Sequence, residues 1–336
     1  MKAMVCVAPG RPLQEQERTM PVPGPGQLLI EVAACGVCRT DLHLVDGELA
    51  GARPGVIPGH EIVGRVVARG PALPEGAPGP GARVGVPWLG STCGHCAHCR
   101  AGRENLCDAA RFTGLQLDGG YAEYALADAR YCFPIPQGYA DVAAAPLLCA
   151  GQIGYRALRM AGEALRIGLY GFGAAAHHGT GRARRGARGL RLHAARRSRG
   201  AGTRAAPRRE LGGFDAARAR RARCRDHLRA GRALVPTALA AVRKGGTVVC
   251  GGIHMSDIPS FPYALLWGER TLRSVANLTR RDGTEFMALA ARVPLHAEVH
   301  EFALRDANLA LERLRTGAFA GAAVLRTGRV AQGAAA

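Results

Sequence analysis

Short apolar runs separated by glycine and proline dominate the first 150 residues of the chain. Residues 27–36 (QLLIEVAACG), 61–70 (EIVGRVVARG) and 81–88 (GARVGVPW) place Val, Leu and Ile between turn-forming residues. That pattern is typical of short β-strands, so this region predicts a β-rich domain. Residues 142–162 are instead rich in Ala and Leu and predict a helix.

The remainder of the chain alternates between strand and helix patterns. We expect strands or turns at 167–170, 243–254 and 270–282, helices at 283–293 and 306–316, and a loose tail at 325–336. Internal repeats are absent from the sequence. Alternating strands and helices predict an α/β fold with a parallel sheet in this part of the chain.

The apolar run 167–170 leads into a glycine-rich turn. Gly171, Gly173 and Ala176 follow the G-x-G-x-x-A spacing of a dinucleotide-binding fingerprint, with Ala in the third place. Gly171 would form the tight turn, and Gly173 would let the backbone approach a pyrophosphate at the N-terminus of the following helix. The sequence therefore predicts a nucleotide cofactor here.

Composition supports a folded protein of two domains. The chain has 336 residues, and 48% of them are hydrophobic, which excludes a disordered protein. A run of about 18 apolar residues is missing, so we expect no membrane span. The first 13 residues lack the apolar core of a signal peptide, and we expect a cytoplasmic protein.

The net charge of +19 is concentrated in one segment. Residues 178–232 contain 18 arginines, no lysine and three acidic residues, and therefore carry +15 of that charge. The same 55 residues contain neither Val nor Ile, although a dinucleotide-binding fold needs a buried parallel strand at this point.

Two interpretations of this segment compete. One is an Arg-rich insertion that binds nucleic acid through phosphate contacts, since Phe214 is its only aromatic residue. The other is a shifted reading frame, because permitted codons for 186–195 and 225–232, read one base later, encode apolar strands. We favour a frame change soon after Ala176 that is reversed near Ala233. If the change lies in the gene, we expect a destabilised protein with weak or no activity.

The cysteines point to metal rather than to disulfides. There are 11 of them in a chain that has no secretory signal. Four follow the spacing C-x2-C-x2-C-x7-C, namely Cys93, Cys96, Cys99 and Cys107. Four thiolates close a tetrahedron around Zn²⁺ and leave no position for a substrate, so this site is expected to be structural. His95 and His98 lie in the same loop and are a lesser alternative as ligands.

A second set of metal ligands is spread along the chain. Cys38 lies in CGVCRTDLH, His60 in PGHEIVG, and Cys149 in APLLCAGQ. Two thiolates and one imidazole leave a fourth zinc position open, as a catalytic zinc site requires. A Cys₂His set of this kind is the one known from alcohol dehydrogenase.

In this order the motifs resemble those of the zinc-dependent alcohol dehydrogenases of the medium-chain dehydrogenase/reductase superfamily. The resemblance covers residues 1–176 and 233–325. It implies an α/β fold, with a β-rich GroES-like catalytic domain at 1–148 and 276–336 and a Rossmann-type cofactor domain at 149–275. It also implies that Cys38, His60 and Cys149 bind the catalytic zinc.

The resemblance assigns further roles. Glu61 is similar to the carboxylate that approaches the metal during ligand exchange, and Asp41 to the one that orients a ligand histidine. Thr40 stands where the family places the hydroxyl that hydrogen-bonds the alcohol. His43 stands where the family places the residue that passes the proton to solvent. Cys35 matches no ligand position.

The implied reaction transfers hydride between a primary alcohol or aldehyde and NAD or NADP, with two Zn²⁺ per chain. Trp88, Phe112 and Leu115 either line the substrate pocket or pack in the core. A homo-oligomer, dimer or tetramer, is usual for the family, and nucleic-acid binding is not expected. The alternatives are a relative that has lost activity or cofactor binding, a non-catalytic zinc protein that binds nucleic acid, and a zinc-free quinone reductase, against which the cysteines argue.

Overall fold

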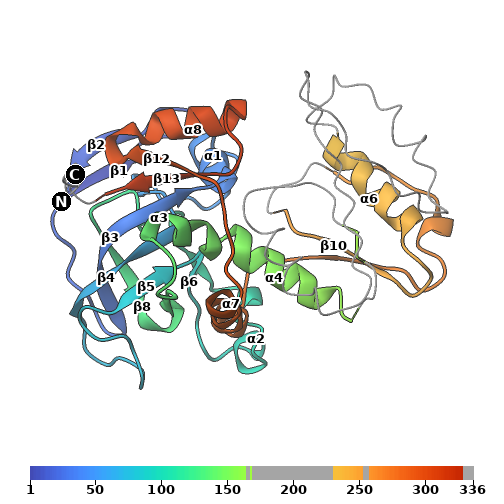
Figure 1. Cartoon of the computed structure of the whole chain (residues 1–336), viewed down its shortest axis with the longest axis horizontal. Helices are drawn as coiled ribbons and strands as arrows, with labels where there is room; N and C mark the ends of the chain where they lie inside the picture. The colour runs from blue at the N-terminus through green and yellow to red at the C-terminus, as the bar shows by residue number, and fades with distance from the viewer. Residues whose placement is uncertain (164–166, 169–229, 253–256, 328–336) are drawn as a thin grey trace.

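A computed structural model describes residues 1–163, 167–168, 230–252 and 257–327 (Figure 1). The fingerprint residues Gly171, Gly173 and Ala176 lie outside the described residues. The Arg-rich segment lies outside them as well, apart from residues 230–232. Of the strand predicted at 167–170, only Ile167 and Gly168 are described, and they belong to neither a helix nor a strand.

The described strands are short, apart from two longer ones that belong to the main sheet. They are β1 (Lys2–Val5), β2 (Gln14–Glu17), β3 (Gln27–Val37), β4 (Glu61–Arg69), β5 (Arg83–Val86), β6 (Leu89–Ser91), β7 (Arg111–Phe112), β8 (Tyr124–Asp128), β9 (Phe133–Pro134), β10 (Thr247–Cys250), β11 (Thr271–Ser274), β12 (Val299–Ala303) and β13 (Ala322–Arg326).

The described helices are mostly short. The α-helices are α1 (Arg39–Val45), α2 (Ala97–Arg100), α3 (Asp141–Ala144), α4 (Ala150–Met160), α6 (Ala230–Ala241), α7 (Arg280–Arg292) and α8 (Ala307–Thr316). The 3₁₀ turns are η1 (Glu104–Leu106), η2 (Ala129–Tyr131), η3 (Ala145–Leu148), η5 (Tyr263–Leu265) and η6 (Leu304–Asp306). None of the described helices is long and apolar enough to cross a membrane.

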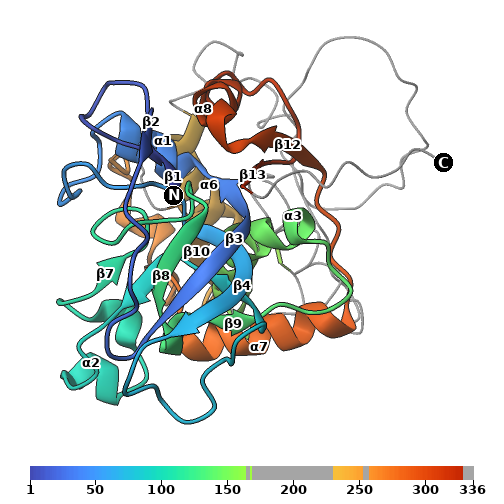
Figure 2. The ribbon, with the colours of Figure 1, turned by 90° about the vertical axis from the view of Figure 1, so that its left-hand side faces the viewer.

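A seven-stranded sheet joins the two ends of the sequence. Its strand order is β12-β13-β3-β4-β5-β9, and β8 also pairs with β3. The pairs are antiparallel except for β12 with β13 (Figure 2). The C-terminal strands β12 and β13 thus complete a sheet that begins near residue 27.

Both faces of this sheet are buried, which explains its continuous apolar runs. Side chains of successive strand residues point to opposite faces. Ile62 of β4 accordingly packs in one hydrophobic cluster, with Leu28 and Ile30, while its neighbour Val63 packs in another, with Phe286. The prediction of strands at 27–36, 61–70 and 81–88 is confirmed.

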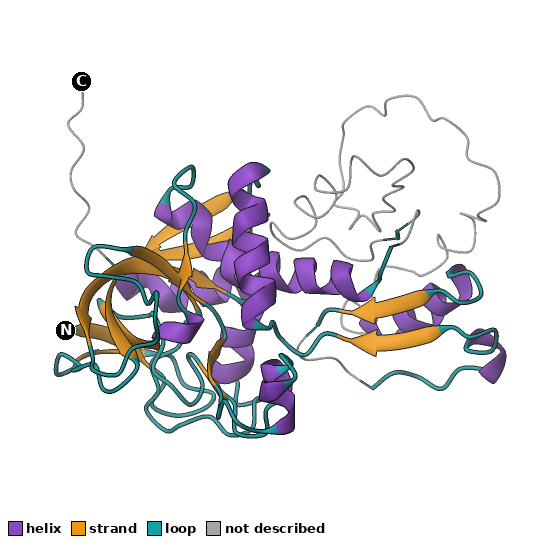
Figure 3. Ribbon diagram, turned by 90° about the horizontal axis from the view of Figure 1, so that it is seen from below, coloured by secondary structure: helices purple, strands orange, loops and turns teal. Residues whose placement is uncertain are grey.

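A second group of elements lies beside the main sheet (Figure 3). Strands β10 and β11 pair in parallel, with Thr247 opposite Thr271, and α6 packs against β10. The strands predicted within 243–254 and 270–282 are thus confirmed, as are the helices predicted at 283–293 and 306–316, which appear as α7 and α8. The sequence pattern did not predict helix α6.

Two predictions are wrong in detail. Residues 142–162 do not form one helix: Pro146 carries no amide hydrogen to continue an α-helix, and the chain changes from α3 through η3 to α4. The predicted loose tail at 325–336 begins too early, because Leu325 and Arg326 pair with β3 and β12 as the end of β13.

Candidate metal centres

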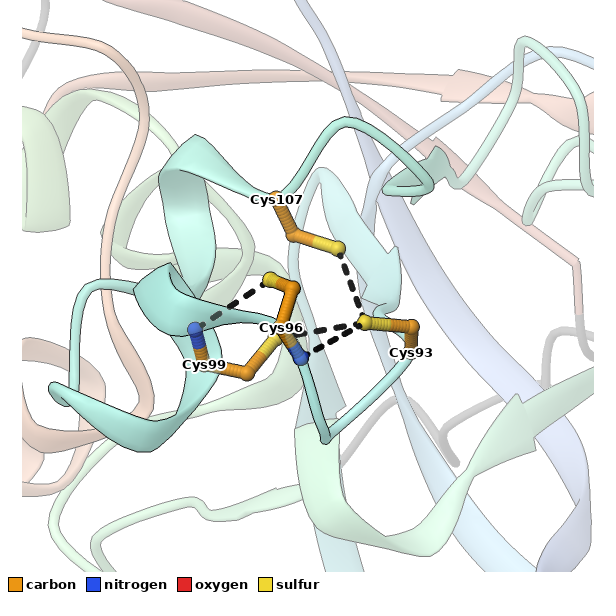
Figure 4. Close-up of side chains that lie close together, drawn as sticks. All are labelled: Cys93, Cys96, Cys99 and Cys107. Atoms are coloured by element: carbon orange, nitrogen blue, oxygen red, sulfur yellow. Dashed lines mark hydrogen bonds between the residues drawn. The ribbon is translucent and has the colours of Figure 1, made fainter.

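The four-cysteine loop brings its thiols together at one point (Figure 4). The Cys93 and Cys99 sulfurs are 3.9 Å apart, and those of Cys93 and Cys107 are 3.5 Å apart. A tetrahedral zinc with Zn–S bonds of about 2.3 Å holds its sulfurs about 3.8 Å from one another. The spacing of these thiols therefore fits a closed zinc site.

Backbone amides favour the thiolate form on one side of this cluster. The amide of Cys96 donates to Cys93 Sγ at 3.4 Å, and the amide of Cys99 donates to Cys96 Sγ at 3.4 Å. Hydrogen bonds from the amides of His95 and Cys96 lower the pKa of Cys93 to about 6. The His95 ring is turned to the carbonyl of Cys93, and neither His95 nor His98 belongs to the cluster.

The second cluster is assembled from three separate turns. Cys38 is the N-cap of α1, His60 immediately precedes β4, and Cys149 lies between η3 and α4. Their donor atoms and a Glu61 carboxylate oxygen all lie within 4.8 Å of one another. The two cysteine sulfurs are 3.7 Å apart, again the spacing that a shared zinc would impose.

The donors of this cluster need a cation. His60 is fully buried, and its Nε2 has no hydrogen-bond partner. The bond from the Cys149 thiol and the nearby His60 lower the pKa of Cys38 well below its ordinary value. Burial alone would lower the pKa of His60, but Asp41 and Cys38 raise it well above its usual range. The donor set of two thiols and an orphaned imidazole nitrogen fits Zn²⁺.

Asp41 holds the turns of this cluster together. Its carboxylate accepts hydrogen bonds from the Cys38 amide at 2.8 Å and from the Gly59 amide at 3.3 Å. Its Oδ1 also lies 3.3 Å from Nδ1 of His60. The Tyr121 hydroxyl donates to Oδ2 at 3.2 Å. Asp41 thus lies beside the His60 imidazole, where an outer carboxylate commonly stands next to a ligand histidine.

Glu61 is buried beside the cluster because the neighbouring strand leaves room for it. Any side chain at Gly36 would collide with its carboxylate. Burial, followed by the charge of Cys38, raises the pKa of Glu61 well above its ordinary value. A carboxyl group is thus held next to the two thiols of the cluster.

Thr40 and His43 lie three residues apart on α1. The Thr40 hydroxyl is buried, 3.7 Å from Cys38 Sγ. His43 is partly exposed, and its Nδ1 pairs with the Glu48 carboxylate. A donor–acceptor side chain at the cluster and an imidazole near the surface are suited to moving a proton between them.

The three expected pocket residues differ in their contacts. The Trp88 ring packs edge-on against the His60 ring at 4.9 Å and stacks on Phe112 at 5.2 Å. Leu115 is buried in the main hydrophobic cluster. Trp88 belongs to the same cluster, so all three residues pack in the core, and Trp88 in addition contacts the His60 ring.

Two residues that contact the predicted site residues belong to no motif in the sequence. Tyr121 reaches Asp41 from a position 80 residues away in the sequence, and Glu48 pairs with His43 from the turn after α1. Neither belongs to a metal-ligand spacing, so only the folded arrangement reveals them. Cys35, which matches no ligand position, is buried and lies outside the cluster.

The structure thus combines a mixed sheet with two clusters of side chains that could each hold a metal ion. The family model described as "Alcohol dehydrogenase GroES-like domain" matches residues 24–137. The chain is 43% identical over 322 residues to a probable alcohol dehydrogenase, AdhA, of Mycobacterium tuberculosis, covering 94% of this chain and 92% of the relative.

Two further similarities extend over nearly the whole chain. An alcohol dehydrogenase of Moraxella sp. is 34% identical over 338 residues, or 97% of this chain and 99% of the relative. The crystal structure of AibC superposes with a TM-score of 0.80 at 26% identity and covers 98% of this chain and 96% of its own. This chain belongs to the alcohol dehydrogenase family.

Proposed function

We propose that the chain is a zinc-dependent oxidoreductase that transfers hydride between a primary alcohol or aldehyde and NAD or NADP. The observation that supports this best is the convergence of Cys38, His60, Cys149 and Glu61 within 4.8 Å in a member of the alcohol dehydrogenase family. Nucleic-acid binding and loss of catalytic function find no support among the relatives.

In the proposed reaction Cys38, His60 and Cys149 hold the catalytic zinc, and Cys93, Cys96, Cys99 and Cys107 hold the structural one. When bound, the catalytic zinc acts as a Lewis acid toward the substrate oxygen. The Thr40 hydroxyl would hydrogen-bond that oxygen and relay the alcohol proton, giving up its own proton as it accepts the new one, and His43 would pass a proton to solvent. Trp88 keeps water from the His60 side of the site.

The cofactor is assigned to the second half of the chain. We propose that residues 149–275 form the cofactor domain, where Gly171, Gly173 and Ala176 bind the pyrophosphate of NAD or NADP. Residues 1–148 and 276–336 form the catalytic domain. A cytoplasmic homo-oligomer, dimer or tetramer, completes the proposal.

An activity assay tests the proposal. The purified, zinc-loaded chain is mixed with NAD or NADP and a series of primary aliphatic and aromatic alcohols, and formation of the reduced nicotinamide is followed at its absorption band. If the source gene restores Val- and Ile-rich strands at 178–232, we expect saturable turnover with at least one nucleotide; if it encodes the Arg-rich segment, we expect weak or no turnover. A chain with the restored segment that is folded, retains its zinc and turns over no alcohol or aldehyde with either nucleotide would contradict the proposal.

The role of Thr40 can be isolated with two substitutions. Replacing Thr40 with Val keeps the shape of the buried side chain but removes the hydroxyl. We expect kcat/KM to fall about 10²-fold, the lower end of what a positioned proton-transfer group contributes. Thr40→Ser retains the hydroxyl and should lose much less activity than Thr40→Val.

Zinc content must remain unchanged in both variants for this comparison. If Thr40→Val and Thr40→Ser were equally active, the hydroxyl would have no part in the reaction.

A further inference from the structure

Cys149 is the N-cap of α4. Its carbonyl accepts the first hydrogen bond of that helix, from the Ile153 amide at 2.9 Å. The position of Cys149 therefore depends on how firmly α4 is held.

Helix α7 holds α4 through two carboxylates: partly exposed Glu285, which contacts Tyr155 and Arg159, and buried Asp282. Asp282, in the first turn of α7, pairs with the Arg156 guanidinium, and its Oδ1 lies 3.2 Å from Nη1 of Arg159. Only 2% of Asp282 is exposed. Close packing adds to this contact, because a Cβ on Gly151 of α4 would lie 2.6 Å from Cζ of Phe286. Figure 1 shows the two helices side by side.

Hydrogen bonds with Thr279, the N-cap of α7, fix the position of Asp282. The Thr279 amide donates to its Oδ2 at 2.9 Å, and the Asp282 amide donates to Thr279 Oγ1 at 3.2 Å, which completes a reciprocal cap. A carboxylate with this many fixed donors has a single available position. It can therefore transmit the position of α7 to α4.

The four-cysteine loop secures the same helix start. Buried Glu104, three residues before Cys107, accepts the Arg280 amide at 2.8 Å and Arg280 Nε at 3.2 Å. The Asn105 amide group donates to the carbonyl of Ala276 at 2.6 Å. A continuous set of hydrogen bonds and ion pairs thus runs from the loop through α7 to α4.

We propose that Asp282 is a positioning residue for Cys149, and that the four-cysteine loop supports it through Glu104 and Arg280. The inference rests on the proposed function, in which Cys149 binds the catalytic zinc. The loop would then serve the catalytic centre as well as the local fold. Breaking the link at Asp282 should loosen Cys149 without disturbing the four cysteines.

The test is Asp282→Asn in the full, zinc-loaded chain, with zinc release to a chelating dye as the readout. We expect the catalytic zinc to leave about tenfold faster. Replacing a residue that holds a metal ligand in place typically weakens metal binding by about 10- to 100-fold, and tenfold is the lower end of that range. Release of the structural zinc should not change. Iodoacetamide should also label Cys149 faster, as measured by peptide mass spectrometry.

Asp141→Asn is the matched control. Asp141 also begins a helix, α3, and also pairs with an arginine, Arg83, but it does not lie on α4 or α7. It should leave zinc release at the parent rate. If Asp282→Asn fails to fold, Arg156→Lys removes the paired geometry from the α4 side and should accelerate release in the same direction.

Two results separate this inference from the proposed function. Parent-like release of the catalytic zinc from folded Asp282→Asn would overturn the positioning role alone. A Cys149→Ala chain that retained two zinc ions would overturn the catalytic assignment of Cys149 and, with it, both proposals.

Discussion

Cys38→Ala is expected to reduce kcat/KM by about 10³-fold or more and to release one of two zinc ions. Cys38 caps α1 and places its sulfur 3.7 Å from that of Cys149. With one thiol and one imidazole left, the open site loses the ligand number that a catalytic zinc requires. A metal that polarises the reacting oxygen contributes several kcal/mol, and each 1.4 kcal/mol is about tenfold in rate.

Cys35→Ala is the matched control for this prediction. Cys35 lies three residues earlier, is fully buried, and has its thiol turned toward the Gly36 carbonyl, outside the ligand cluster. Its replacement should cost some stability but leave both zinc ions and most of the activity. Steady-state kinetics with metal analysis check both variants. Equal losses in the two would show that packing, and not zinc binding, accounts for the effect.

Cys99→Ala is expected to have the largest effect on stability. Structural zinc sites contribute directly to folding, and Cys99 is a buried member of the closed cluster. Loss of the metal would also free Glu104, whose buried carboxylate holds Arg280 at the start of α7. We expect the melting temperature to fall by about 10 °C, since each lost kcal/mol lowers Tm by roughly 2–4 °C in a chain of this size class.

His95→Ala tests whether this loss is specific to the thiols. His95 lies in the same loop but turns its ring to the Cys93 carbonyl. The variant should melt near the parent temperature and keep its structural zinc. Differential scanning calorimetry and metal analysis measure both. If His95→Ala lost zinc and Cys99→Ala did not, the ligand set would be wrong.

Local sequence signals were sufficient to find the residues of both clusters and most strands. The four cysteines are close in sequence, so their spacing alone predicts a closed site. The strand at 61–70 follows from its apolar residues between turn signals. The pattern at 142–162 predicts one continuous helix, because Ala and Leu on both sides of Pro146 favour a helix. It therefore does not predict the break between η3 and α4 at Cys149.

Contacts between distant segments could not be predicted. Tyr121 meets Asp41, and Asp282 meets Arg156, only because separate segments pack together. Neither contact corresponds to a residue spacing that can be recognised in the sequence. The frame change inferred for 178–232 remains a prediction, and sequencing the source DNA across codons 170–240 decides it: a one-base difference that restores Val- and Ile-rich strands would support it.

Metal analysis of the purified chain tests the central claim most directly. Zinc per chain is measured for the parent, for Cys38→Ala and for Cys99→Ala by inductively coupled plasma mass spectrometry. Two separate clusters predict two zinc ions in the parent and one in each variant. A parent chain with a single zinc that persists in Cys38→Ala would contradict the assignment of Cys38, His60 and Cys149 as a catalytic zinc site.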